Sequence, residues 1–568
     1  MFHKVSSDET IRGGRFYLRG GVVFALLWLV TFCLYFPAAR AGFVADFTGW
    51  LDQVQNHSFL ENLNRTNYKV RSLYQFTQLS TYIFYKLFGT SVWLWHLLFV
   101  TMHVINAFLL YTLVLLVLED NAVKRRQEIT LAGALLFCIT PYASEVIVWE
   151  PSYHFLQGLM MILLILLLTR LYSLGFGKKY AIAAVLIYFI STFSLEVFYV
   201  TPFLVLGYAL YVRYGVSFTG SLQRRIVLKH IFVPMLLLLA AHFVTYRVVY
   251  GTWVAHISSD NTVGITLSSF GKPAKYLFHL FFVGRFFPHE IKQAVYAFCD
   301  SAAGIAIFYL TVLTIGIDIA RKLGTMSRKA RVTALLFVWM LITLLLLVPL
   351  WFQDILLVLH DRYLYFTCAF FYMLFAVLVF FIPFRAVRLG ILVIFGLVNL
   401  RYAVQASRYW GKSEKVIAGL LNSIPDEKNR TVILLNMPQS MHGVAMIGAE
   451  QESEYQLMHN LLRPQRQLHT TVHDAMAYNM DTPTDGANAI VINDSTIKVT
   501  LNQWGTWWWY EARGGKSYEN GDYKLDLKDP GHYYELTLKK PAAQFLLLYQ
   551  VGNQWKVVDW DKKNEEQR

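Results

Sequence analysis

Long apolar segments recur along the first 404 residues, and they constrain the fold more than any other feature of the sequence. Each is close to the roughly 20 residues that an α-helix needs to cross the hydrocarbon core of a bilayer. Apolar residues make up 56% of the chain, charged residues only 15%, and the mean hydropathy is +0.40. The sequence therefore predicts a polytopic α-helical membrane protein.

The positions of these segments predict about eleven crossings. The apolar stretch 270–288 is assigned to an interfacial or re-entrant segment, because a twelfth crossing would place the basic residues at 321–322 and 328–329 outside. The predicted spans are 21–38, 91–117, 129–149, 154–174, 180–195, 197–213, 230–249, 300–320, 332–351, 363–383 and 387–404.

Basic residues give the orientation. The net charge of +14 does not indicate nucleic-acid binding, since Lys and Arg cluster in short connections between apolar segments, such as 124–126 and 224–225. The positive-inside rule makes these connections cytoplasmic. With an N-terminus inside and an odd number of crossings, residues 405–568 lie on the outer face, together with the long loops 39–90 and 250–299. The first of these loops is expected to carry helices lying flat on the membrane.

The pattern changes after residue 404. We expect a transmembrane domain at 1–404, a linker at 405–424, a small mixed α/β domain at 425–560 and a polar tail at 561–568. The aromatic run from Trp504 to Tyr510 predicts a strand core or a membrane-facing belt, with the stacking of sugar rings as an alternative. Within the α/β domain, strands are predicted at 431–435, 489–501, 522–527, 532–539 and 543–559, and a helix at 451–462.

Ionisable residues gather at the predicted outer ends of the spans. Asp46 follows the first span, Glu145 lies near the end of the third, and Glu196 lies between the fifth and sixth. Asp361 and Arg362 precede the span 363–383. Charges at the edge of a membrane are costly and usually serve function, although any one of them could also cap a helix. Their gathering on one face favours a site.

Short motifs in a fixed order resemble the GT-C superfamily of membrane glycosyltransferases, in particular the protein O-mannosyltransferases and the transmembrane-and-TPR mannosyltransferases. The order and spacing are similar over about residues 20–404. The chain departs from the pattern because Phe47 stands where a second acid follows Asp46, and no helical repeat of about 34 residues follows the last span. The matching segments are Arg71-Ser72-Leu73, Lys86 to Gly89, His96 with His103 and Asn106, Pro141 to Trp149, Ser194-Leu195-Glu196 and Asp361 to Tyr365.

The resemblance implies transfer of a sugar from a polyprenyl-phosphate donor to a hydroxyl of a protein, glycan or lipid at the outer face. The incoming hydroxyl must lose a proton, which makes Asp46 the expected catalytic base. A planar guanidinium stabilises a departing phosphate, which points to Arg362, with Arg247 and Arg285 as lower-ranked partners. A single displacement inverts the anomeric configuration.

Six further residues are expected to support the site or to contact the sugar or the acceptor: Glu145, Glu196, Asp361, Tyr153, His154 and Arg71. No metal or other cofactor is expected, although related oligosaccharyl transferases use a divalent ion; His96 and His103 lack the i, i+4 spacing of a helical metal site. The organelle signals that would place the chain elsewhere are missing, which favours a bacterial inner membrane. Two alternatives remain open: a transporter or flippase for a polyprenyl-linked or anionic substrate, and a scaffold whose outer domain binds a partner.

Overall fold

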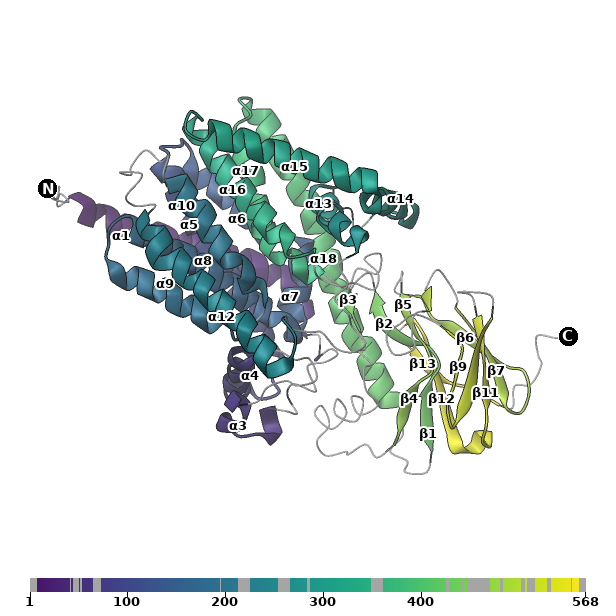
Figure 1. Cartoon of the computed structure of the whole chain (residues 1–568). Coiled ribbons are helices and arrows are strands. Elements are labelled where there is room, and N and C mark those ends of the chain that lie inside the picture. The colour runs from purple at the N-terminus through teal and green to yellow at the C-terminus, as the bar shows by residue number, and fades with distance from the viewer. Residues whose placement is uncertain are drawn as a thin grey trace.

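The computed structural model has a helical bundle followed by a region of β-sheets (Figure 1). It describes residues 8–40, 42–43, 51, 54–64, 73–194, 196–212, 225–253, 266–282, 284, 287–348, 361–424, 430–441, 444–446, 470–480, 484–501, 506–507, 516–528, 533–552 and 554–560.

Six helices in the described part of the chain are long and apolar enough to cross a membrane: Val92–Asp120, Glu150–Ser173, Arg225–Tyr250, Ala302–Lys322, Asp361–Phe380 and Arg385–Ser423. A pair of helices, Arg126–Cys138 and Pro141–Val148, qualifies as a seventh if its 55° bend belongs to one broken span. The chain thus has the composition of a multi-pass membrane protein. Most of the described residues in the eleven predicted spans are helical, but the number eleven itself stays a prediction.

The bundle follows the order of the sequence. Its helices are α1 (Asp8–Tyr35), α5 (Val92–Asp120), α6 (Arg126–Cys138), α7 (Ser144–Val148), α8 (Tyr153–Ser173), α9 (Lys178–Ser191), α10 (Thr201–Val212), α12 (Val233–Tyr250), α15 (Ala302–Lys322), α16 (Arg328–Leu345), α17 (Tyr365–Phe380) and α18 (Arg385–Ser423).

Local chemistry sets several of these boundaries. Ser301 and Ser327 cap α15 and α16, accepting hydrogen bonds from the backbone N–H groups of Gly304 at 3.0 Å and Ala330 at 3.3 Å. At the end of α12, Gly251 adopts a left-handed φ of 73°, which glycine tolerates without a steric penalty. Gly133 lets α6 approach α17 closely, because a Cβ at this position would lie 2.6 Å from Met373 Sδ.

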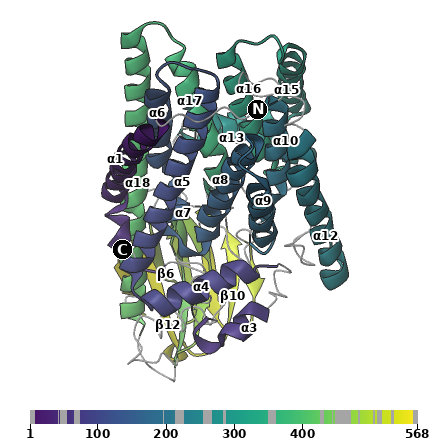
Figure 2. The same ribbon diagram turned by 90° about the vertical axis from the view of Figure 1, so that its left-hand side faces the viewer.

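The short helices α3 (Phe59–Asn64) and α4 (Gln75–Phe88) follow the first predicted span, and α4 lies across one end of the bundle (Figure 2). The segment 270–288 forms α13 (Lys272–Phe282) and leads into α14 (His289–Asp300). In a soluble protein a helix usually buries its apolar side chains and exposes its charged ones. Helix α13 does the reverse at four positions, because it buries Lys272 and Lys275 and exposes Phe281 and Phe282. That arrangement suits a helix with a polar interior on one side and lipid on the other.

Helix α18 continues from the bundle to the sheet region without a break, so residues 405–423 of the expected linker are helical. Ser413 Oγ donates to the carbonyl of Ala445 at 3.0 Å, and Trp555 Nε1 donates to that of Val416 at 3.0 Å. These bonds fix strands of the sheet region against the last turns of α18.

The described residues of the sheet region form three sheets. Their orders are β13-β12-β1-β4, β6-β7-β11-β10-β9 and β3-β2-β5-β8. In the first sheet β1 runs parallel to β12, with Val432 opposite Leu546. The strands are β1 (Thr431–Leu434), β2 (Met437–Met441), β3 (Val444–Ala445), β4 (Val472–Asp474), β5 (Ala477–Met480), β6 (Ala487–Val491), β7 (Thr496–Leu501), β8 (Thr506–Trp507), β9 (Tyr518–Glu519), β10 (Tyr523–Lys528), β11 (Tyr533–Leu538), β12 (Phe545–Val551) and β13 (Gln554–Val557).

The predicted strands coincide with β1, β6 and β7, β10, β11, and β12 and β13. Most of the aromatic run 504–510 and the predicted helix at 451–462 lie outside the described residues; only the backbone of Thr506–Trp507 is described, as β8. The coarse prediction of a helical membrane protein with a C-terminal sheet region is therefore confirmed, while the GT-C fold stays a prediction.

Candidate functional site

An ion pair joins two predicted site residues that are 217 positions apart. Glu145 lies in α7, and Arg362 lies in the short helix Asp361–Leu364 that leads into α17. The backbone N–H of Arg362 donates to Glu145 Oε2 at 2.9 Å, and its guanidinium Nη1 donates to Oε1. The side chains of Glu145 and Arg362 are only 4% and 16% exposed, so the pair is largely removed from solvent.

Two aromatic rings lie beside the guanidinium of Arg362. The Cζ atom of Arg362 lies 4.9 Å from the ring centre of Trp149 and 4.9 Å from that of Tyr363. Arginine stacks on aromatic faces while its N–H groups remain in the plane for hydrogen bonds. Together with Glu145, these rings give the guanidinium one fixed orientation. The positive charge of a guanidinium held here can attract an anion.

Helix α13 adds a polar face to this pair. Burial raises the pKa of Tyr276 well above its ordinary value, and the negative charge of Asp361 raises it further, with Glu145 also contributing. Asp361 is itself buried, with 4% of its surface exposed. The adjacent His279 accepts a 2.6 Å hydrogen bond from Tyr142 at its backbone carbonyl. The polar side of α13 therefore faces both carboxylates.

Glu196 forms a second cluster with Tyr74 and His154. The Tyr74 hydroxyl donates to the two carboxylate oxygens of Glu196 at 3.0 and 3.3 Å. The Tyr74 ring stacks on His154, with centroids 6.2 Å apart and planes inclined by 28°. Burial raises the pKa of Tyr74 well above 10, with Glu196 as the next cause and Tyr363 as a smaller one. Tyr363 thus interacts electrostatically with Tyr74 and also contacts the guanidinium of Arg362.

Tyr153 joins the bundle to α4. Its hydroxyl lies 2.8 Å from Ser80 Oγ and 2.7 Å from Thr81 Oγ1, and it donates to the backbone carbonyl of Thr77 at 2.6 Å. Because Tyr153 is fully buried, these bonds position α4 at the start of α8. Through these hydrogen bonds Tyr153 holds two neighbouring parts of the site in position, the next residue His154 and the residues that precede α4.

The structure does not bring all predicted residues together. Arg247 is exposed at the end of α12, where its guanidinium donates to the carbonyl of Gly251 and lies 5.9 Å from the ring centre of Trp253. It therefore contacts its own loop. Asp46, Arg71 and Arg285 lie outside the described residues.

One buried carboxylate beside the site was missed at the sequence level. Glu150 is fully buried directly after Trp149, and its Oε1 lies 3.6 Å from His96 Nε2. An acidic residue in the first turn of a helix, here Trp149-Glu150-Pro151 before α8, is a signal that could have found it. His103 contacts the Tyr365 hydroxyl through Nδ1 at 2.8 Å.

No group of three metal-ligating side chains occurs among the described residues. In comparisons with known proteins, no family model matches the sequence, and no curated protein matches it. The resemblance to GT-C enzymes thus depends on the motifs given above alone.

Proposed function

We propose that this chain is an inverting glycosyltransferase that moves a sugar from a polyprenyl-phosphate donor to a hydroxyl acceptor at the outer face of a membrane, in bacteria the inner membrane. The observation that carries the proposal is the guanidinium of Arg362, held between Trp149 and Tyr363 and bonded to Glu145. An arginine fixed in this way at the end of a membrane helix suits a lipid phosphate, which brings its charge to that depth.

In the proposed reaction the acceptor oxygen attacks the anomeric carbon of the sugar, and the bond from that carbon to the phosphate oxygen breaks. The acceptor proton passes to the carboxylate of Asp46. The bonding electrons leave with the polyprenyl phosphate, whose added negative charge is stabilised by Arg362. The donor and the acceptor supply every atom of the products, so no oxidant or reductant is needed.

The remaining residues have supporting roles. Glu145 orients Arg362 by accepting from both its backbone and its side chain. Glu196 and His154, linked through Tyr74, offer hydrogen-bonding groups for sugar hydroxyls. Asp361 directly precedes Arg362 in the chain. Its negative charge partly compensates the positive charge of the guanidinium while no donor is bound.

The test uses the purified full chain with a panel of short-chain polyprenyl-phosphate hexoses. Release of free sugar is followed with water as the acceptor, so that the natural acceptor need not be known. We expect Asp46→Asn to abolish release with little change in donor binding. Arg362→Lys should weaken donor binding and slow release by roughly 10²-fold, the loss typical of one transition-state hydrogen-bond donor.

Arg321→Gln serves as the control, because this exposed arginine at the end of α15 lies outside the proposed site. It should behave like the wild type. Release at wild-type rate by both Asp46→Asn and Arg362→Lys would refute the site, and donor transport without release would favour the transporter alternative.

A further inference from the structure

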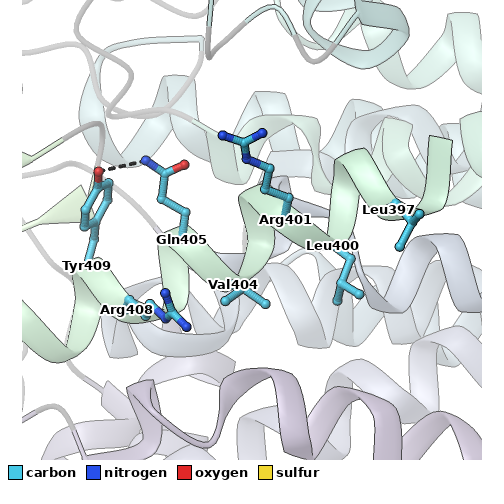
Figure 3. A pocket seen from close by; sticks show the side chains of 7 residues that line it. All are labelled: Leu397, Leu400, Arg401, Val404, Gln405, Arg408 and Tyr409. Carbon is cyan, nitrogen blue, oxygen red and sulfur yellow. Dashed lines mark hydrogen bonds between the residues drawn. The ribbon is translucent and has the colours of Figure 1, made fainter. Parts of the chain in front are cut away.

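Helix α18 carries a groove on its exposed side, away from the site of Glu145 and Arg362. The groove has a volume of about 660 Å³, within the range of roughly 300–1,000 Å³ that ligand sites occupy. Every described side chain that lines it belongs to α18 (Figure 3).

The lining changes character along the helix. Leu397, Leu400 and Val404 form its apolar part, and Leu397 is 59% exposed. Arg401 and Arg408 are both exposed and are seven residues apart. This spacing places their Cα atoms on the same side of the helix, about 10 Å from each other along the axis. Leu397, Arg401 and Arg408 are exposed, so the packing of the bundle does not explain why apolar and basic side chains lie next to each other here.

Neither guanidinium is neutralised within the described residues. Arg401 lies 5.9 Å from the ring centre of its neighbour Tyr402, and no carboxylate of the described chain forms an ion pair with Arg401 or Arg408. The only hydrogen bond drawn in the groove runs from Gln405 Nε2 to the Tyr409 hydroxyl at 2.7 Å (Figure 3). Two positive charges are therefore available to a ligand.

The depth of the groove is given by the sequence around it. The apolar segment predicted at 387–404 ends here, and two partly exposed tyrosines, Tyr402 and Tyr409, lie on either side of this end, as is typical of the membrane–water interface. Anionic lipid phosphates lie at this level, and arginines near the surface attract them. Arg401 and Arg408 then face the headgroup region, while the leucines face the acyl chains.

We infer that this face of α18 binds an anionic membrane phospholipid, with the lipid phosphate between Arg401 and Arg408 and the acyl chains against Leu397 and Leu400. The site is separate from the proposed transfer reaction. A lipid bound there would anchor α18, the helix that leads to the sheet region, in one leaflet of the membrane.

The test is native mass spectrometry of the full chain, purified in detergent and supplied with equal amounts of phosphatidylglycerol and phosphatidylcholine. The wild type should retain phosphatidylglycerol in preference. In the double variant Arg401→Gln/Arg408→Gln its binding should weaken by about 30-fold, equivalent to about 2 kcal/mol, with phosphatidylcholine unaffected. Arg401→Lys/Arg408→Lys should keep most of the preference, because it keeps both charges.

Arg321→Gln/Arg328→Gln removes the same charge from exposed positions at the ends of α15 and α16, and it should retain the wild-type preference. Equal losses in this control and in the Arg401/Arg408 variant would overturn the inference, because net charge alone would then explain binding. So would full retention by the Arg401/Arg408 variant, or complete displacement of the lipid by millimolar inorganic phosphate, which would indicate a site for small anions. A thermal unfolding scan without lipid checks that each variant is folded.

Discussion

The ion pair between Glu145 and Arg362 predicts strong energetic coupling. Both side chains are largely buried, so removing one charge leaves the other without compensation in a poorly solvated place. Breaking a buried pair in this way costs roughly 3–5 kcal/mol, whereas replacing both partners together costs much less. We therefore expect Glu145→Gln and Arg362→Met each to destabilise the protein clearly, and the double variant to lose far less than the sum.

Geometry makes Gln and Met the suitable replacements. Glutamine keeps an oxygen that can accept from the backbone N–H of Arg362, which lies 2.9 Å from Glu145 Oε2. Methionine keeps an unbranched apolar side chain between Trp149 and Tyr363. The cycle thus removes the two charges while disturbing the packing little, and the coupling should be roughly 2–3 kcal/mol.

The assay is thermal unfolding of the four proteins in one detergent, combined with denaturant titration where unfolding is reversible. The exposed pair Arg126–Glu119, with an N–O distance of 3.1 Å and side chains 42% and 52% exposed, provides the control cycle. Exposed pairs couple by about 1 kcal/mol or less. If the buried pair couples no more strongly than this control, the conclusion that Glu145 holds Arg362 in place is wrong.

Three further predictions concern other parts of the site. Tyr74→Phe removes the hydrogen bonds to Glu196 and should weaken sugar-donor binding by roughly tenfold or more in a titration, without affecting binding of a bare polyprenyl phosphate. Tyr153→Phe frees α4 from α8 and should raise amide hydrogen exchange in 75–88 selectively, measured by mass spectrometry. Burial, with Lys275 as the next cause, lowers the pKa of Lys272 from 10.5 to about 8. The unfolded chain therefore binds more protons between these values, so stability should rise with pH from 8 to 10.5 by at most about 3 kcal/mol, and this rise should be absent from unfolding scans of Lys272→Met.

Hydropathy and alternation predicted the elements that follow local rules. The strands β7 and β11 show period-2 burial, and Val432–Leu434 in β1 are apolar and fully buried, so these strands were recognisable. The strand β2, Met437–Met441, contains Pro438 and Gln439 and has no such pattern. It forms because β5 and β3 supply hydrogen-bonding partners, and that information is not local.

The site shows the same division. The count of crossings predicted that Glu145, Glu196, Asp361 and Arg362 share one end of the bundle, and the structure links Glu145 with Arg362 directly. The order of the membrane crossings could not predict which of these side chains contact one another. Which carboxylate bonds to Arg362, and which rings cover it, depends on the packing of α7 against the start of α17. For the same reason the burial of Glu150 became visible only in the folded chain.

Helix α18 gives the site its relation to the sheet region. The helix packs against α7, which carries Glu145, and against the turn before it, and farther along it packs against β3 and β13. A single helix of 39 residues thus touches both the proposed phosphate site and the C-terminal sheets. The expected linker at 405–424 was inferred from a fall in hydropathy, which a helix leaving the membrane produces equally well. Because the connection is helical, and because α18 contacts both α7 and the strands β3 and β13, the sheet region is joined to the helix that lies against Glu145's own helix without an irregular linker between them.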